Sequence, residues 1–331
     1  MTIRFGVIGA GRIGKVHSRT IAANPKAQLA YIADAMPKAA SDLAAQYGAK
    51  VATVEEIMAA KDVDAVLIGS PTGFHAEQIQ AASHAGKAIM CEKPVSLSVA
   101  KIEETLRVVE KNKSTLMIGF NRRFDPSFAE VEARIRRGDV GTVEMVTVIS
   151  RDPNPPPAEY VKGSGGIFAD MMIHDFDMAR FLMGEEFVIV NALGAALVDK
   201  AIGEAGDVDT AAVQMQTKSG KIAVITNSRR ATYGYDQRME VHGSKGMVHA
   251  KNIHNTTVET LNDKGYQADP IQNFFLERYL GAYTSELNTF IQAVETGNRD
   301  PKPNGYDGLQ AQKLAEAATE SWKTGKPVKV S

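Results

Sequence analysis

The feature that most constrains this chain is a glycine pattern that joins a short apolar segment to a helical one. Gly9, Gly11 and Gly14 follow the apolar run 3–8 directly and open a stretch with helical spacing. In a strand–turn–helix context the first glycine permits a tight turn, the second lets the backbone approach a pyrophosphate, and the third lets helix pack on strand. The amides at the helix start then face the phosphates. The opening residues therefore predict a dinucleotide-binding turn.

The first third of the chain alternates apolar runs with helical patterns. Because strands that alternate with helices are joined by right-handed crossovers, this order predicts a parallel, doubly wound sheet with both faces buried. A further helix is expected after residue 125, with Pro126 in its first turn. The expected strands are 3–8, 29–33, 65–68, 88–91 and 116–120, and the expected helices are 12–23, 37–47, 75–85 and 98–112.

After Gly141 the pattern changes to successive strands, which predicts a largely antiparallel sheet. The expected strands are 143–149, 187–198, 208–217, 221–229, 237–242 and 253–261, and helices are expected over 168–183, 274–296 and 307–324. We therefore expect an α/β chain with two domains. Residues 1–120 would form an NAD-binding Rossmann domain. Residues 121–331 would form a substrate-binding and oligomerisation domain with a large open sheet, whose last helices can pack back on the first domain.

Composition excludes several classes of protein. The chain has 331 residues, 44% of them hydrophobic and 23% charged, with a formal net charge of −1, so it lacks the basic surface that nucleic acids or anionic membranes require. Cys91 is the only cysteine, which rules out an intramolecular disulfide and the usual structural zinc patterns. The first residues lack a signal-peptide pattern, and no segment approaches the ~20 apolar residues of a membrane span. We expect a cytoplasmic protein without a metal.

An acidic residue marks the cofactor. Asp34 ends the second expected strand, 20 residues after Gly14. A carboxylate there accepts hydrogen bonds from the adenosine ribose hydroxyls and repels a 2′-phosphate. Ala35 follows, so no arginine stands beside Asp34 to pair with such a phosphate. The pattern favours NAD over NADP.

Two further groups carry candidate chemistry. Lys93 follows the strand expected at 88–91, at the sheet edge where open α/β sheets bind ligands. Asp170 and His174 are four residues apart on an expected helix, which would place them on one face together with Asp177. Alcohol oxidation needs a base near neutral pH, and histidine beside a carboxylate suits that role. Taken singly, Lys93 fits a solvated loop cation equally well, and Asp170 with His174 fits a surface ion pair.

These residues carry a family resemblance. The chain resembles the glucose–fructose oxidoreductase / inositol dehydrogenase / rhizopine-catabolism (Gfo/Idh/MocA) family over essentially its whole length, and within it the bacterial inositol 2-dehydrogenases. The matching stretches are Val7–Gly14, Glu92-Lys93-Pro94 and Gly165–Asp177, and the combination with Asp152–Pro157 is the more specific sign of the inositol enzymes.

The resemblance implies NAD-dependent oxidation of a ring hydroxyl, with myo-inositol to 2-keto-myo-inositol (scyllo-inosose) as the leading reaction. His174 would accept the proton, Lys93 would hold the reacting hydroxyl, and Asp170 would position and tune the pair. It also implies a cis bond before Pro94 and a homotetramer built on the open sheet. The implied cofactor-binding residues are Gly9, Ala10, Gly11, Arg12, Ile13, Asp34, Ser70, Pro71, Thr72, His75, Glu92 and Lys93, and the implied substrate-binding residues are Lys93, Arg123, Asn154, Asp170, His174, Tyr233 and Tyr235.

Three alternatives stay open at this point. The substrate could be another inositol stereoisomer or an aldose pyranose, because pocket shape depends on the loops near 152–163 and 230–236. A non-catalytic NAD sensor would keep the glycine turn and lose the lysine and histidine, and this chain retains both. His75 fits a cofactor-side residue and a helix cap equally well.

Overall fold

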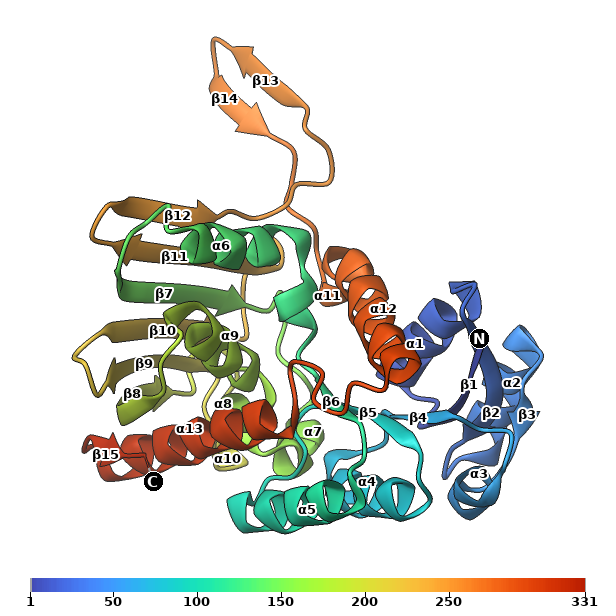
Figure 1. Ribbon diagram of the computed structural model, residues 1–331. Coiled ribbons are helices and arrows are strands. Elements are labelled where there is room, and N and C mark those ends of the chain that lie inside the picture. Colours follow the sequence, from blue (N-terminus) through green and yellow to red (C-terminus); the bar gives the residue numbers. More distant parts are fainter. Residues whose placement is uncertain (1, 331) are drawn as a thin grey trace. The chain divides into compact units, whose positions relative to one another are not determined.

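The computed structural model describes residues 2–330. They form two compact units, each built around its own sheet (Figure 1). The first unit contains the residues up to 124 together with 282–312, and the second contains 125–281 and the residues from 313 onward. Of the helices between residues 2 and 330, none combines the length and the hydropathy that a transmembrane span requires.

The first unit contains a six-stranded parallel sheet in the order β3-β2-β1-β4-β5-β6. This is the doubly wound order, in which the strand sequence reverses between β1 and β4 and leaves a crevice at the carboxyl ends of the strands. The expected Rossmann sheet is confirmed. The strands are β1 (Ile3–Ile8), β2 (Ala27–Ala33), β3 (Lys50–Val51), β4 (Ala65–Ile68), β5 (Ala88–Glu92) and β6 (Leu116–Gly119).

The crossover helices lie close to their expected positions. They are α1 (Arg12–Ala23), α2 (Pro37–Tyr47), α3 (Val54–Ala59), α4 (His75–His84) and α5 (Val99–Asn112), with short 3-10 turns η1 (Thr72–Phe74) and η2 (Asn121–Phe124). Two elements, β3 and α3, were not predicted, because β3 is a two-residue exposed edge strand and α3 is a six-residue helix. A local signal for α3 is present: Thr53 and Glu56 form a reciprocal capping box at its start.

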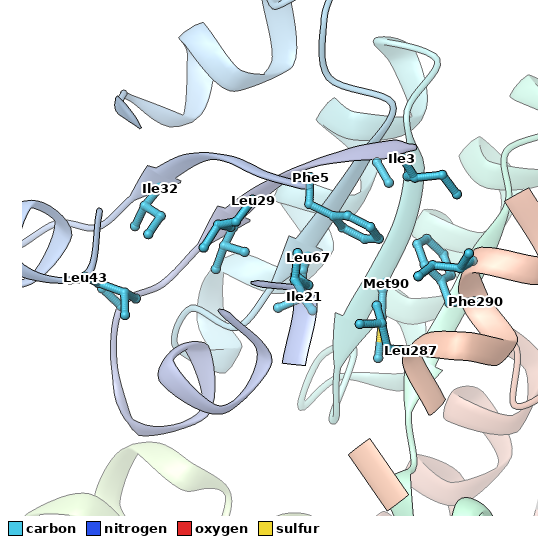
Figure 2. Close-up of a cluster of buried hydrophobic side chains, with 14 of the residues drawn as sticks. Ile3, Phe5, Ile21, Leu29, Ile32, Leu43, Leu67, Met90, Leu287 and Phe290 are labelled. Carbon is cyan, nitrogen blue, oxygen red and sulfur yellow. The ribbon is translucent and has the colours of Figure 1, made fainter. Parts of the chain in front are cut away.

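A helix from the end of the chain completes the core of the first unit. Helix α12 (Leu280–Thr296) contributes Leu287 and Phe290, which cluster with Phe5, Leu67 and Met90 from three neighbouring strands (Figure 2). The rings of Phe5 and Phe290 lie 6.0 Å apart, centroid to centroid. Residues 282–312 are therefore part of the nucleotide-binding unit, although they are remote from it in sequence.

The second unit contains a seven-stranded sheet in the order β12-β11-β7-β10-β9-β8-β15. Strands β7 and β10 are parallel and every other pair is antiparallel, so the expected mostly antiparallel sheet is confirmed. The strands are β7 (Val143–Arg151), β8 (Phe187–Ala195), β9 (Thr210–Thr217), β10 (Ile222–Ser228), β11 (Asp236–Gly243), β12 (Gly246–Ala250) and β15 (Val328–Lys329).

The strand expected over 253–261 is wrong. Within residues 253–258 the described backbone makes one isolated bridge, between His254 and Ile271, and the side chains there are mostly exposed. The chain instead forms a separate hairpin from β13 (Glu259–Asn262) and β14 (Gly265–Ala268), which projects from the second unit (Figure 1). Hydrophobic periodicity alone cannot distinguish a strand of the large sheet from a strand of a separate hairpin, since both are short segments of β-forming residues.

Helices cover one face of the second sheet. Helix α9 packs on β7, and α6 packs on β12 and α9. The helix expected over 274–296 is interrupted at Tyr279, whose ring is buried against Phe128 and Tyr235. The helices are α6 (Pro126–Arg137), α7 (Ala158–Ser164), α8 (Gly166–Asp170), α9 (Ile173–Met183), α10 (Lys200–Glu204), α11 (Phe275–Arg278) and α13 (Gly305–Thr324), the last contributing residues to both units.

Candidate functional site

The glycine loop has the geometry that its sequence predicts. Gly9 has a φ of +107°, and a Cβ there would lie 2.4 Å from the carbonyl oxygen of Gly69. A Cβ on Gly14 would lie 1.9 Å from the carbonyl oxygen of Gly9, so only glycine lets α1 pack this closely on the loop. Gly11, the N-cap of α1, has open space where its Cβ would be. The loop therefore leaves its backbone accessible at the helix start, as a bound pyrophosphate requires.

Asp34 holds the glycine loop through its carboxylate. Its Oδ2 accepts a hydrogen bond from the amide of Ala10 at 2.6 Å, and its Oδ1 accepts one from the amide of Met36 at 2.7 Å. A carboxylate has about four acceptor positions, so these two bonds leave room for ribose hydroxyls. Asp34 thus links the second strand to the loop that follows the first, and the residues present fit NAD.

The loop after β4 carries three of the expected cofactor residues. Ser70 donates a hydrogen bond to Gln78 at 2.6 Å, and Pro71 is the N-cap of η1, which begins at Thr72. The glycine loop lies close to the start of this segment, because a Cβ added to Gly69 would lie 3.4 Å from the side chain of Ile13. These residues therefore lie at the carboxyl edge of the first sheet, whereas Arg12 is exposed at the start of α1.

Lys93 lies half-buried in the turn after β5, and the peptide bond between Lys93 and Pro94 is cis, as the resemblance implied. The preceding side chain, Glu92, is buried and its Oε1 lies 2.7 Å from Nε2 of His17. His75 is 2% exposed, and its ring nitrogens lie 2.8 Å and 2.7 Å from the carbonyl oxygens of Pro94 and Ser70. Burial lowers the pKa of His75, although both carbonyl contacts act to raise it. The ring thus contacts the loops through both nitrogens, a role that sequence analysis did not foresee.

Asp170 and His174 lie on two helices, so the continuous helix expected over 168–183 is wrong. Helix α8 ends at Asp170 and α9 begins at Ile173. The amides of Met171 and Met172 both bond to the carbonyl of Ile167, which widens the last turn. Residues 171–173 are all buried. In a continuous helix three consecutive side chains point in different directions, so the break between α8 and α9 allows all three to be buried.

The carboxylate of Asp170 is held by two groups that sequence analysis missed. Its Oδ1 accepts a hydrogen bond from the hydroxyl of Tyr160 at 3.0 Å, and its Oδ2 lies 3.4 Å from the guanidinium of Arg229. Both Asp170 and His174 are half-buried. Arg229 is itself buried and follows β10, so the second sheet fixes the orientation of this carboxylate.

Two neighbouring aspartates anchor α9. Asp175 is fully buried and accepts hydrogen bonds from Ser150 at 2.5 Å and Asn227 at 2.8 Å, which ties the helix to β7 and β10. Asp177, expected beside Asp170, is buried and lies 3.7 Å from Arg180. Sequence analysis overlooked Asp175, and its signal would have been a charged residue inside an otherwise apolar helical run.

The remaining expected substrate residues have different surroundings. In the first unit, Arg123 forms an ion pair with Asp307 at 2.9 Å. In the second, Asn154 is exposed in the proline-rich loop, and Tyr235 is buried in an aromatic cluster. The side chain of Tyr233 is exposed over about half its surface, and its hydroxyl donates a hydrogen bond to Asp236 at 2.7 Å. Partial burial and this hydrogen bond both raise the pKa of Tyr233. Of the two tyrosines, Tyr233 is therefore the one whose surface a small molecule can reach.

No group of three or more histidine, cysteine, aspartate or glutamate side chains within residues 2–330 is arranged to hold a metal ion. The candidate chemical groups are Lys93 in the first unit and Asp170 and His174 in the second.

Comparison with known proteins extends this description to the whole chain. The model of the oxidoreductase family's NAD-binding Rossmann fold matches residues 3–120, and that of the same family's C-terminal alpha/beta domain matches residues 132–330. An inositol 2-dehydrogenase of Rhizobium meliloti is 54% identical over 97% of each chain. A myo-inositol dehydrogenase structure from Corynebacterium glutamicum superimposes with a TM-score of 0.95 at 45% identity, covering 100% of this chain and 99% of the other.

A third relative was solved with ligands. The scyllo-inositol dehydrogenase of Lactobacillus casei, with bound NAD(H) and scyllo-inositol, superimposes with a TM-score of 0.93 at 32% identity over 100% of this chain and 99% of the other. The two family models together cover almost every residue of the chain. The chain therefore belongs to the Gfo/Idh/MocA oxidoreductase family and carries an NAD-binding Rossmann domain.

Proposed function

We propose that this chain oxidises a ring hydroxyl of a cyclic polyol with NAD, and that its main reaction converts myo-inositol to 2-keto-myo-inositol. The observation that carries the substrate is the 54% identity to an inositol 2-dehydrogenase over nearly the full length of both chains. The observation that carries the chemistry is that Lys93, Asp170 and His174 are all present, Lys93 at the carboxyl edge of the nucleotide-binding sheet.

In this proposal each residue has one role. Bound NAD supplies the acceptor for the hydride that leaves the carbon under oxidation. His174 accepts the hydroxyl proton, since a neutral imidazole is a base near physiological pH. Lys93 donates a hydrogen bond to the same hydroxyl oxygen and stabilises the negative charge that develops on it. Asp170, oriented by Tyr160 and Arg229, holds and tunes the pair.

This mechanism makes a demand on the two units. Lys93 belongs to the first unit, and Asp170 and His174 belong to the second, so both must reach one substrate molecule for the reaction to proceed. Arg123, Asn154 and Tyr233 are proposed to contact other hydroxyls of the ring. Tyr235, which is buried among Phe274 and Tyr279, is proposed to shape the pocket from behind.

A substrate screen tests the proposal. Purified protein is mixed with NAD and either myo-inositol, scyllo-inositol, chiro-inositol or glucose, and NADH formation is followed by absorbance. We expect the highest kcat/KM with myo-inositol. The scyllo isomer is the second candidate, because a relative that covers the whole chain was solved with it. No NADH from any of the four compounds would overturn the proposal, and a preference for glucose would move the substrate class to aldose sugars.

The second sheet supports a proposal about assembly. Ile222, Met145, His242 and Met247 are cross-strand neighbours in a row over four strands, and the three apolar ones are 38%, 42% and 48% exposed in the order Ile222, Met145, Met247. A row of exposed apolar side chains on a sheet face is typical of an interface. We propose that this face packs on a second copy of the chain within a homotetramer.

Light scattering coupled to size exclusion tests the assembly. We expect a tetramer at micromolar concentration, and Met145→Asp should lower the mass because it places a charge in the row. Val51→Asp, which places the same charge at an exposed position of β3 in the first unit, is the matched control and should leave the mass unchanged. A wild-type monomer would contradict the proposal.

A further inference from the structure

The turn that carries Lys93 is held on both sides by buried histidines from two different helices. Before Lys93, the carboxylate of Glu92 lies 2.7 Å from Nε2 of His17, on α1. After Lys93, the carbonyl oxygen of Pro94 lies 2.8 Å from Nδ1 of His75, the first residue of α4. His17 and His75 are 1% and 2% exposed, so solvent does not compete for either contact.

The surroundings of Glu92 fit one orientation of its side chain. Gly119, its neighbour on β6, has no Cβ, and a Cβ there would lie 3.0 Å from Oε2 of Glu92. On the other side, the ring of His17 packs edge-on against Tyr283 of α12, with centroids 5.3 Å apart. The glycine and the tyrosine together keep the carboxylate and the imidazole facing each other.

His75 joins two loops at the carboxyl edge of the first sheet. Carbonyl oxygens only accept hydrogen bonds, so each ring nitrogen must carry a proton to bond its partner. The neutral ring donates one bond at a time, and the protonated ring donates both. Its Nε2 faces the carbonyl of Ser70, which follows β4, and its Nδ1 faces Pro94, which follows β5. The ring therefore lies between the proposed cofactor loop and the Lys93 turn, and with its proton on Nδ1 it donates to Pro94 in that turn.

We infer that His17 and His75 are positioning residues for Lys93, which fix its backbone from both sides while its side chain contacts the substrate. The inference rests on the proposed function, in which Lys93 holds the reacting hydroxyl. A lysine side chain has four rotatable bonds, so the backbone under it must be rigid for the ammonium to reach one position. Misplacement by about 1 Å at a reacting centre can lower the rate by roughly 100-fold.

The test uses the two amide side chains as replacements for single ring nitrogens. The Asn amide nitrogen stands close to Nδ1 of a histidine, and the Gln amide nitrogen stands close to Nε2. His75→Asn therefore keeps the bond to Pro94, and His75→Gln keeps the bond to Ser70. We expect His75→Gln to lower kcat with myo-inositol by about tenfold or more, whereas His75→Asn stays within about threefold of wild type.

The same logic applies to His17. His17→Gln keeps a hydrogen-bond donor that faces Glu92, so its kcat should stay close to that of wild type. His17→Phe keeps only an aromatic ring, so its kcat should be lowered. This pair provides the test if the His75 variants do not fold. His84→Ala, at the exposed far end of α4, is the matched control and should change neither kcat nor KM.

A double-mutant cycle separates positioning from a general loss of structure. In a Lys93→Ala background, His75→Gln should lower kcat little further, because there is no longer an ammonium to position. Equal kcat in His75→Asn and His75→Gln, or an undiminished effect in the Lys93→Ala background, would overturn the inference alone. An unchanged kcat in Lys93→Ala by itself would overturn the proposed function as well.

Discussion

The two sheets of this protein bury their strands in different ways. In the first unit every residue of β4 and β6 is buried, because helices cover both faces of a parallel sheet. In the second unit β9 and β10 alternate between buried and more exposed positions, because helices cover one face. Polar functional groups are therefore confined to strand ends in the first unit, whereas in the second they also enter the interior along the strands.

Interior polar groups of the second sheet hold the residues of the proposed site. Ser150 and Asn227, which lie on β7 and β10, bond to Asp175 of α9, the helix that carries His174. In the first unit the comparable groups, Asp34 and Lys93, follow strands β2 and β5 directly. The first unit thus presents chemistry through loops at one sheet edge, and the second presents it through helices fixed to a sheet face.

The largest expected effect tests this division of roles. His174→Ala should lower kcat with myo-inositol by roughly 10²–10⁴-fold, the range for loss of a general base. The Kd for NAD should not change, since the glycine loop belongs to the other unit. Steady-state kinetics and a fluorescence titration with NAD measure both.

His84→Ala, at an exposed position at the end of α4, is the control for that experiment and should behave as wild type. A near-normal kcat in His174→Ala would remove His174 from the mechanism. Weakened NAD binding would show that the two units do not divide the work as proposed.

The cofactor preference gives the next largest effect. Asp34→Ala combined with Ala35→Arg should shift preference from NAD toward NADP, because the carboxylate is removed and a partner for the 2′-phosphate is added. The structure adds that Asp34 also holds the amide of Ala10, so kcat/KM with NAD should fall by about 10–100-fold, the loss of one or two bonds to a charged group. Comparing kcat/KM for the two cofactors measures the shift.

Ala35→Arg alone keeps the carboxylate and should still prefer NAD, which makes it the control. If the double variant prefers NAD as strongly as wild type does, Asp34 does not determine the choice of cofactor.

A buried carboxylate in the second unit gives a stability effect. Burial alone would raise the pKa of Asp236, but hydrogen bonds from Arg238, Tyr233 and Asn252 outweigh it and hold this pKa below its usual range. The ionised form therefore stabilises the folded state above pH ~4, and this contribution is lost as the pH falls further. Asp236→Asn should lower the free energy of unfolding by about 2 kcal/mol at pH 7.

Urea unfolding at several pH values measures this effect, with Glu240→Gln on the same strand as an exposed control. The difference in the free energy of unfolding between wild type and Asp236→Asn should become smaller below pH ~4. A gap that is the same at every pH would show that packing, and not charge, accounts for it.

The first unit provides the opposite case, a buried carboxyl whose effect on stability has the opposite dependence on pH. Glu286 of α12 is fully buried, and its carboxyl oxygens have no hydrogen-bond partner within residues 2–330. Burial, with a smaller contribution from Glu92, raises the pKa of Glu286 well above its usual value. The carboxyl is therefore neutral in the folded state and ionised in the unfolded chain, so stability falls as the pH rises above ~4.3.

Glu286→Met should abolish this dependence. Its unfolding free energy should exceed that of wild type by an amount that grows by about 1.4 kcal/mol per pH unit above pH ~4.3, up to the folded-state pKa. Parallel curves for wild type and variant over pH 4.5–7 would mean that Glu286 is ionised in the folded protein. The two carboxyls thus predict opposite pH slopes, one for each unit.

The contrast between the units also explains which elements the sequence could predict. In the first unit the short elements β3 and α3 were not predicted, but the strands and helices that were predicted are accurate to within a few residues, because continuous apolar runs and the glycine pattern leave one arrangement. In the second unit the short elements α7, α10, β12 and β15 were not predicted, and the errors are a strand expected at 253–261 and helices expected to be continuous at Met171 and Tyr279. Each error lies where a buried side chain or a projecting hairpin, and not local periodicity, determines the backbone.

The sequence by itself predicted the nucleotide-binding turn, NAD as the cofactor, and Lys93, Asp170 and His174 as candidates, because each prediction depends on residue type at a fixed spacing. Only the tertiary structure determined the partners of these residues. His17 and His75 stand 75 and 19 positions from the groups they contact, and Arg229 stands 59 positions from Asp170. Such contacts arise where distant segments meet at a sheet edge or face, so the spacing along the chain contains no signal for them.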